Sequence, residues 1–418
     1  MSQSSARAHI PVVMYHGVGR PDPTWPWHPL TVKWTFFDRQ LGALREAGYR
    51  AITLAEFYER QAAGHPPNER LLVLTFDDGY LDNWVYAVPI MRRHGMRGTV
   101  YVNPDFMDPG KSPRPTLDSI GTRGIAEDDL PIRGFMNAAE LRAGVDAGLL
   151  EIGCHSRTHT WYPMSPRIID YHRPGAWYPW LAWNARPDRK HAYLTEDQSA
   201  FLPWGTPVYE SGRSLGIRRY FPDPGISDTI IDHVQRNGGA AFFGTPCWQR
   251  DLASITENLS AETGRYESDA EMQAHFHDEI LASPVDLETR LGVPVDHFAW
   301  PGGSYTDSSW AIAAASRYTT LAVSPHDKLR WRLTDPHLMR RLSCHSRLSL
   351  LGRSFPNTHA RALLHACEAH RGIHAHRHFL RVYKILAALA APRPLWAHAT
   401  RRSPDRTKGP QDSGDYAG

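Results

Sequence analysis

Two groups of side chains in this sequence have the types and the spacing needed to bind a metal ion and activate water. Asp77 and Asp78 are consecutive and are followed by Gly79, while His155 and His159 lie four residues apart. Two histidines at this spacing can point at one ion, and a carboxylate from another segment can complete a set of three ligands that leaves positions on Zn²⁺ open. Such a metal can polarise a carbonyl group and acidify a bound water, and the second aspartate could accept the proton of that water.

Both groups directly follow segments that we expect to be buried strands. The unbroken apolar run 71–76 precedes Asp77, and residues 149–154 precede His155. Each signal is weak by itself, because Asp-Asp-Gly is also a common turn sequence and the chain contains 23 histidines. Their shared position is informative, because the C-terminal strand ends of a parallel α/β barrel meet on one face and carry the active site. A third strand-like segment, 297–300, is followed by a Pro-Gly-Gly turn.

Strand-like and helix-like segments alternate along the chain, which is typical of parallel α/β architecture. Further strands are expected at residues 10–15, 50–54, 98–102 and 319–323, and helices at residues 37–47, 85–94, 138–147, 269–291 and 311–317. We therefore predict one α/β domain over residues 10–350.

The alternation of strands and helices breaks between about residue 160 and about residue 258. We interpret this segment as an insertion rich in Trp and Pro. Six of the 14 tryptophans lie there. They could serve as aromatic platforms for sugar rings, or they could be the large apolar anchors that irregular segments need in order to fold. For each individual tryptophan, the structural interpretation is slightly favoured.

The composition excludes several classes of protein. The 418 residues carry 47 basic and 44 acidic side chains, a net charge of +3, and 41% of them are apolar. This content supports a large core, and the balanced charge argues against a nucleic-acid partner. No stretch reaches the ~20 apolar residues of a membrane span. The polar residues 1–10 lack the apolar region of a secretory signal, and the four cysteines lie far apart, so we expect a cytoplasmic protein with reduced thiols.

The composition shifts after residue 350. Residues 351–400 are rich in His and Arg and predict a helical appendage, and residues 401–418 predict a disordered tail. The histidines could bind metal, and the basic helix with the apolar run 379–391 could associate peripherally with an anionic membrane. A solvated helical appendage packed on the core is the favoured interpretation.

The motifs resemble those of the polysaccharide deacetylase family, also called the NodB-homology domain or carbohydrate esterase family four. The similarity spans roughly residues 11–342, is interrupted by the insertion, and favours the bacterial exopolysaccharide branch. The segments that carry it are Val13-Met14-Tyr15-His16, residues 37–49, Thr75-Phe76-Asp77-Asp78-Gly79, His155-Ser156-Arg157-Thr158-His159, residues 287–292 and Phe298-Ala299-Trp300-Pro301-Gly302-Gly303.

The resemblance implies a distorted (β/α) barrel of the NodB-homology type with the insertion and the helical appendage, and one divalent metal, with zinc as the expected ion. It implies Asp77 as the general base and Asp78, His155 and His159 as the metal ligands. It further implies that Ser156 supports the histidine loop, which we define as residues 155–159. Around the third motif, it places Trp300 in a pocket wall and, after Pro301, the Gly302 N–H as a donor to the oxyanion.

The sequence departs from the family's motifs in several respects. Trp300 stands where the family usually has Tyr, and neither a clean fourth motif nor the Arg of another form of the third motif is found. The sequence leaves two candidates for the general acid. One is His345, in a segment that only loosely resembles the fifth motif, and the other is His16, at the C-terminal end of the first predicted strand. His345 is as readily a plain surface residue.

We therefore expect a metal-dependent hydrolase that removes acetyl groups from N-acetylated sugars of a polysaccharide or of a glycan precursor, such as a lipid-linked sugar. One alternative is hydrolysis of a cyclic or small-molecule amide at the same site. Another is a non-catalytic glycan-binding module, which would be expected to have lost at least one of Asp77, Asp78, His155 and His159.

Overall fold

A nine-stranded sheet organises the protein. The computed structural model describes residues 9–25, 27–63, 68–122, 124–258, 264–324, 337–344, 346–350 and 353–390. The strand order is β14-β13-β12-β7-β6-β5-β1-β15, with β4 as an additional partner of β5, and every pairing is parallel. The strands are β1 Val12–Tyr15, β4 Arg50–Ala51, β5 Leu71–Phe76, β6 Gly98–Val102, β7 Leu150–Cys154, β12 His297–Ala299, β13 Thr320–Val323, β14 Leu338–Arg340 and β15 Leu342–Ser343.

Two short strands near the end of the domain bring the edges of the sheet together. β14 pairs with β13 at one edge and β15 pairs with β1 at the other. Only Arg341 separates these two strands in the chain, and one residue spans no more than ~3.6 Å. The sheet therefore curls into a nearly closed barrel. The barrel is distorted because its two edges are joined through the chain at Arg341, and β14 and β15 are not paired as neighbouring strands. The predicted distorted (β/α) barrel is confirmed.

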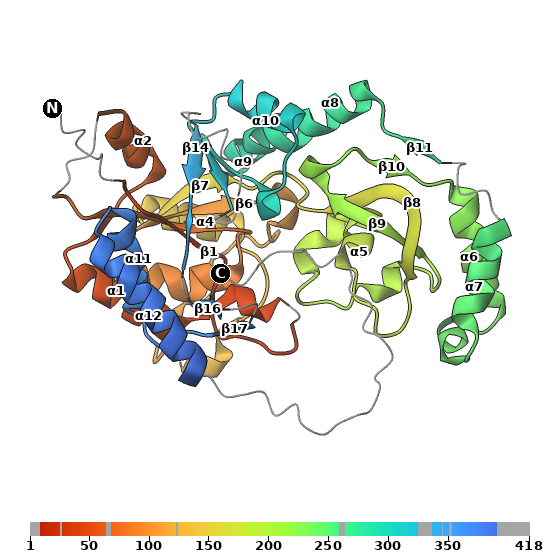
Figure 1. Ribbon diagram of the computed structural model, residues 1–418, viewed down its shortest axis with the longest axis horizontal. Helices are drawn as coiled ribbons and strands as arrows, with labels where there is room; N and C mark the ends of the chain where they lie inside the picture. The colour runs from red at the N-terminus through yellow and green to blue at the C-terminus, as the bar shows by residue number, and fades with distance from the viewer. Residues whose placement is uncertain are drawn as a thin grey trace.

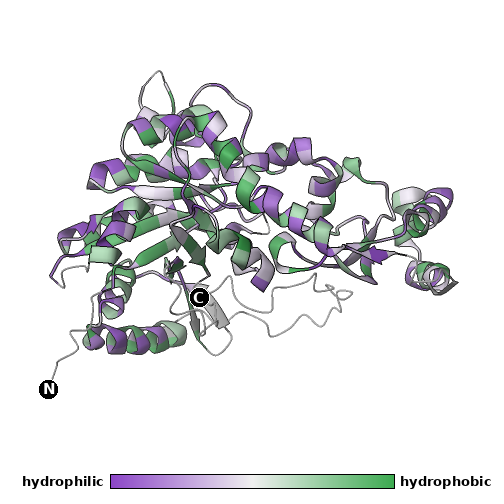
Figure 2. Cartoon of the chain, turned by 90° about the horizontal axis from the view of Figure 1, so that it is seen from above, coloured by the Kyte–Doolittle hydropathy of each residue, from purple (hydrophilic) through white to green (hydrophobic). Residues whose placement is uncertain are grey.

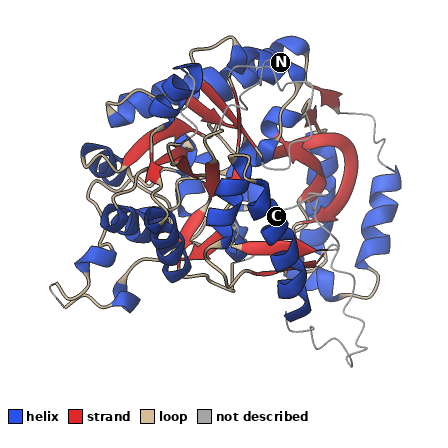
Figure 3. Cartoon of the chain, turned by 60° about the vertical axis from the view of Figure 1, so that its left-hand side comes forward, coloured by secondary structure: helices blue, strands red, loops and turns tan. Residues whose placement is uncertain are grey.

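Helices surround the strands (Figures 1 and 3). They are α1 Trp34–Glu46, α2 Leu54–Ala63, α3 Val88–His94, α4 Ala138–Asp146, α8 Asp269–His277, α9 Ser283–Leu291 and α10 Asp307–Ala314. In α1 the predicted apolar stripe of Phe37, Leu41 and Leu44 is fully buried. Gly48 follows the end of α1 with φ +82, a conformation that glycine adopts without strain. Figure 2 shows hydrophobic residues concentrated on the strands and the helix faces that cover them.

The region between β7 and α8 forms a lobe beside the barrel and contributes no strand to the large sheet (right side of Figure 1). Its elements are β8 Trp161–Tyr171 and β9 Pro207–Arg213, which are antiparallel, with α5 Pro179–Ala185, β10 Tyr220–Phe221, α6 Pro224–Arg236, α7 Trp248–Asn258 and β11 Arg265–Tyr266. Trp180 and Trp183 are buried in a cluster with Tyr80 and Phe106, so these two tryptophans are structural anchors. The ring of Trp177, in contrast, is 40% exposed.

The segment after residue 350 begins as part of the barrel's own core. Leu363 and Cys367 on α11 (Ala362–His370) are fully buried in the main hydrophobic cluster. The next helix, α12 (His374–Ala390), packs on α11 and is mostly exposed. The predicted helical appendage is therefore present, whereas the tail 401–418 lies outside the described residues. Within the described ranges, no helix combines the length and the apolarity that a membrane crossing requires.

The remaining strands form two small sheets, β2 Gly17–Gly19 with β3 Thr31–Lys33, and β16 Arg347–Leu350 with β17 Arg353–Pro356. The first of these pairs starts directly after His16 and extends the loop that follows β1.

Candidate metal centre

Side chains from several strand ends converge at one end of the barrel. The residues that directly follow β1, β5, β6, β7, β12 and β14 are His16, Asp77, Asn103, His155, Trp300 and Arg341. Parallel strands end on the same face, so this placement follows from the topology.

Asp78, His155 and His159 form the one group among the described residues that has three potential metal ligands within 4.8 Å of one another. Asp78 Oδ1 lies 3.4 Å from His155 Nε2 and 3.3 Å from His159 Nε2. Around a tetrahedral ion with ligand distances of ~2.1 Å, neighbouring ligand atoms are ~3.4 Å apart. The three side chains therefore fit a zinc-like ion, and the histidine-rich C-terminal segment forms no comparable group within its described part.

The His155 imidazole has a lone pair available on the side that faces Asp78. His155 Nδ1 lies 2.8 Å from the Ala299 carbonyl oxygen, which can only accept, so Nδ1 carries the proton and Nε2 does not. Burial lowers the pKa of His159 to about 3 against the opposing charge of Asp78, and the nearby Arg213 guanidinium lowers it further. A neutral imidazole is the form that binds metal.

The backbone is strained at this site. Asp78, Ser156 and His159 have φ values of 70°, 62° and 41°, and they are the only non-glycine residues of the described chain with positive φ. Such conformations cost ~1–3 kcal/mol each and persist where the surrounding structure imposes them. Asn103 contributes to this, because its side-chain amide donates to the carbonyls of His155 and, at 3.2 Å, Ser156.

Asp77 has a different environment from its neighbour Asp78. Its Oδ1 accepts a hydrogen bond of 2.6 Å from Arg341 Nη1, and both side chains are buried. Burial by itself would raise the pKa of Asp77, but the nearby Arg341 guanidinium outweighs it and holds the pKa below its ordinary value. Asp77 is thus a carboxylate held in place beside the ligand group without belonging to it.

Arg341 was not found by sequence reasoning. It is the single residue between β14 and β15, two strands that are too short to be predicted. Its Nε also donates to the Val323 carbonyl, at 3.2 Å, which orients the guanidinium toward Asp77.

The other predicted residues are placed as follows. His16 is near the ligand group, where burial lowers its pKa against the opposing charges of Asp78 and Asp77. The Ser156 hydroxyl accepts from the His159 N–H at 3.4 Å, which is the position predicted for a support of the histidine loop. His345 lies outside the described residues.

Trp300 lies in the core, contrary to the prediction of a pocket wall. Its side chain is 1% exposed and its ring stacks on Trp310, with further contacts to Phe298 and Tyr305. These neighbouring rings surround the indole with apolar contacts, which accounts for its burial.

The backbone conformation of Gly302 accounts for a glycine in the Pro-Gly-Gly turn. It has φ 55° within the 3-10 turn Pro301–Gly303, and N–H groups in the first turn of a helix have no partner within it. A Cβ at this position would lie 1.9 Å from the guanidinium carbon of Arg213, the last residue of β9. Arg213 also stacks on Trp161 at 4.6 Å, so the lobe delivers a buried cation next to the proposed oxyanion donor.

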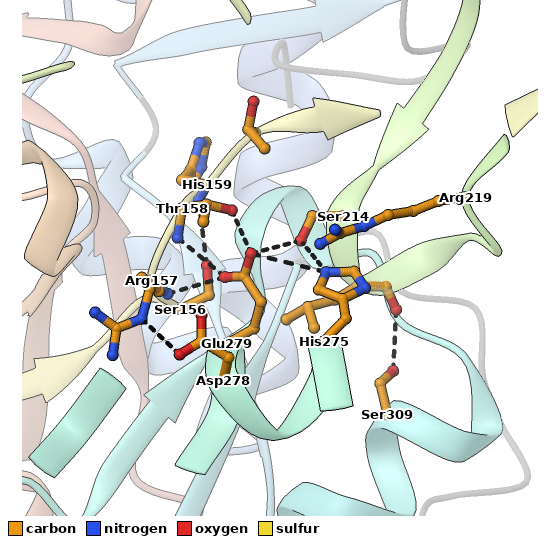
Figure 4. A network of polar contacts seen from close by, with 12 residues as sticks. Ser156, Arg157, Thr158, His159, Ser214, Arg219, His275, Asp278, Glu279 and Ser309 are labelled. Atoms are coloured by element: carbon orange, nitrogen blue, oxygen red, sulfur yellow. Dashed lines mark hydrogen bonds and ion pairs between the residues drawn. The ribbon is translucent and has the colours of Figure 1, made fainter. Parts of the chain in front are cut away.

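Glu279 holds the histidine loop from below (Figure 4). Its Oε2 accepts from the backbone N–H groups of Arg157 and Thr158, each at 3.0 Å, and its Oε1 accepts from the hydroxyls of Thr158 and Ser214. Glu279 is 1% exposed and lies in the π-helical turn Asp278–Ala282 between α8 and α9. An acidic residue inside a predicted helix gives no sequence signal for this role.

Glu279→Gln should weaken metal binding by ~10- to 100-fold, the usual effect of removing a partner that orients metal ligands. The amide retains one acceptor oxygen but cannot accept all four bonds, so the loop that carries His155 and His159 should loosen. Metal titration against a chelating indicator measures this effect. Asp278→Asn is the matched control, because the Asp278 side chain is 55% exposed and bonds only the Arg157 guanidinium. Equal affinities of both variants would contradict the role of Glu279.

Fold and site together define a (β/α) barrel with a candidate mononuclear metal centre at the C-terminal strand ends. Residues 64–199, which include all three candidate ligands, match the family model for polysaccharide deacetylase. A polysaccharide deacetylase domain is thus present in this chain, as its motifs suggested.

Among curated proteins, the Bacillus subtilis protein YxkH, named for polysaccharide deacetylase, is 30% identical over 95 residues, which cover 23% of this chain and 32% of that protein. Poly-β-1,6-N-acetyl-D-glucosamine N-deacetylase of Escherichia coli K12 is 35% identical over 63 residues, covering 15% and 9%. The chain thus spans a third or less of the length of these relatives.

Two solved structures are similar in fold. The BpsB deacetylase domain of Bordetella bronchiseptica has a TM-score of 0.46 at 17% identity, covering 82% of this chain and 98% of that one. A de-N-acetylase of Aggregatibacter actinomycetemcomitans has a TM-score of 0.47 at 14% identity, covering 80% and 94%. Because both TM-scores are below 0.5, the fold is assigned from the strand order of the sheet and not from these two structures.

Proposed function

We propose that this protein is a metal-dependent hydrolase that removes acetyl groups from N-acetylated sugars of a polysaccharide or a glycan precursor. Zinc is the proposed ion, because two imidazole nitrogens and one carboxylate are a ligand set that leaves Zn²⁺ open for chemistry. The named substrate of the Escherichia coli relative, an N-acetylglucosamine polymer, supports this class of substrate.

The observation that carries this proposal is that two consecutive aspartates have different contacts. Asp78 faces His155 and His159, whereas Asp77 is bonded to Arg341 at 2.6 Å. A site that only binds a metal needs no second, oriented carboxylate, but hydrolysis of an amide needs a base beside the attacking water.

Each residue then has a definable task. A metal held by Asp78, His155 and His159 would polarise the acetyl carbonyl and acidify water. Asp77, kept ionised and oriented by Arg341, takes the proton of the attacking water. The Gly302 N–H donates to the oxygen that becomes negative as the carbonyl carbon turns tetrahedral.

The departing amine needs a proton, and His16 is the candidate donor among the described residues. It directly follows β1 and lies near Asp77 and Asp78, whose charges act on its pKa. Its role stays a prediction, as does that of His345.

Acetate release is the direct test. The purified protein should release acetate from N-acetylglucosamine oligosaccharides or lipid-linked N-acetylated sugars, and a chelator should abolish the release until metal is restored. Activity on cyclic amides but on no sugar would favour the alternative substrate class. Glycan binding without release of any acyl group would favour a binding module.

We also propose that α12 associates with anionic membrane surfaces, where a lipid-linked substrate would be found. Val382, Ile385, Leu386 and Leu389 are 49–79% exposed and lie at helical spacing, with Arg377, Arg381 and Lys384 on the same helix. An apolar stripe flanked by basic residues is typical of helices that lie in the membrane interface.

Leu386→Glu combined with Leu389→Glu should weaken association with vesicles that contain anionic lipid by about tenfold or more, because each inserted leucine contributes on the order of 1–2 kcal/mol. Substitution is preferable to truncation after residue 350, which would remove the core residues Leu363 and Cys367. Ala375→Glu, at an exposed position of the same helix, controls for added charge. Vesicle sedimentation that is equal for all variants would contradict this proposal.

A further inference from the structure

A cavity of about 400 Å³ lies between the loop after β2 and the lobe segment 172–202. We propose that it binds a sugar residue of the glycan chain other than the unit that is deacetylated, an inference that builds on the proposed function. The volume is within the range of small-ligand sites, ~300–1,000 Å³.

Aromatic rings supply much of the cavity wall. Trp25, Trp177, Tyr178, Trp183 and Tyr193 all line it. Trp27 links two of them, with its ring 6.4 Å from Trp25 and 4.7 Å from Trp177. Trp177 is the most accessible of these rings, at 40% exposure, although a large apolar ring is normally covered. The C–H faces of a sugar ring pack on such surfaces while its hydroxyls remain available for hydrogen bonds.

The cavity wall also contains polar side chains. Thr24, Thr195, Gln198 and Ser199 line it. Hydroxyl and amide groups can both donate to and accept from sugar hydroxyls.

The charges around the cavity favour a neutral ligand. Arg133 lines the cavity but pairs with Asp22, and Glu196 lines it but pairs with Arg189. Asp197 also lines the cavity and accepts from the Ser199 N–H. With its arginine paired and a second carboxylate present, the described wall does not favour a phosphate or nucleotide group. A neutral sugar is therefore a better match than the diphosphate of an activated or lipid-linked sugar.

A chain of side-chain contacts links the wall of the cavity to the candidate metal centre. Trp183 contacts Phe106 at 5.2 Å, and Phe106 contacts His159 at 6.5 Å between ring centroids. Lys190, from the same lobe segment, donates to the carbonyl of Thr158 in the histidine loop at 3.1 Å. The rings of Trp183 and Phe106 thus lie between the cavity wall and His159, so a sugar bound in the cavity is not the unit that carries the reacting acetyl group.

The test measures binding of N-acetylglucosamine oligosaccharides of one to five units to the full-length metal-loaded protein, by calorimetry and tryptophan fluorescence. The Asp77→Asn background prevents turnover. We expect affinity to rise with chain length and Trp177→Ala to weaken binding of the longer oligosaccharides by about tenfold, as loss of one stacking ring should. Trp177→Phe should retain part of the affinity. Tyr58→Ala is the matched control, because Tyr58 on α2 is 38% exposed and does not line the cavity.

The outcomes separate this inference from the proposed function. If Trp177→Ala binds long oligosaccharides as tightly as Tyr58→Ala does, the cavity proposal is overturned even when the wild-type protein releases acetate. If the wild type releases no acetate from any sugar but Trp177→Ala still weakens binding selectively, the cavity proposal stands and the deacetylase proposal falls.

Discussion

Asp77→Asn is expected to lower kcat for acetate release by ~10²–10⁴-fold, the usual contribution of a positioned base. The amide cannot accept the proton of the attacking water. Metal content should stay near that of the wild type, because the Asp77 carboxylate faces Arg341 and the three candidate ligands are left unchanged. Steady-state kinetics together with elemental analysis of the purified variant measure both quantities.

Adding metal should not restore the activity of Asp77→Asn, and this separates a missing base from a missing ion. Arg341→Met is an informative companion, because it leaves Asp77 present but removes the 2.6 Å bond that orients it. A smaller loss of kcat is expected there. If Asp77→Asn instead emptied the metal site, the roles of the two aspartates would have to be exchanged.

Asp78→Asn should have the opposite signature, with loss of metal as the primary effect. Its Oδ1 is the atom that both histidines face, at 3.4 and 3.3 Å, and an amide is a much poorer ligand for a divalent ion than a carboxylate. We expect metal affinity to fall by at least 100-fold and activity to fall with it. Activity should recover in part when excess metal is supplied.

The control for Asp78→Asn is Asp118→Asn, which makes the same chemical change at a 43%-exposed carboxylate that pairs with Arg92. It should leave metal content and turnover unchanged. The idea of a metal centre would be refuted if Asp78→Asn kept both its metal and its activity.

Local patterns in the sequence predicted the position of the site well. The apolar run before Asp77 and the strand before His155 are buried strands, β5 and β7. Residues that follow parallel strands must emerge on one face, so placing a residue at a strand end places it in space. The histidine spacing worked for a related reason, since four residues are few enough for local backbone geometry to determine where both rings point.

Residues that act from a distance could not be predicted in this way. Glu279 is one acidic residue inside a helix, and nothing within the helix indicates that it accepts four hydrogen bonds from the histidine loop and Ser214. Asn103 and Arg213 likewise reach the site from separate elements. Trp300 was misplaced because its motif predicts position along the strand but not which neighbouring rings compete for its side chain.

The sequence by itself determined the parallel α/β pattern, the strand ends, the family motifs and the set of side chains capable of metal chemistry. These features depend on interactions within a few residues, or on the shared direction of parallel strands. The family resemblance implied which aspartate binds the metal, whereas only the tertiary structure decided that the other aspartate faces Arg341. That choice depends on closure of the barrel, where β14 and β15 bring a residue 264 positions away to Asp77. Contacts between residues so far apart in the chain are set by the packing of the whole sheet, which no local pattern encodes.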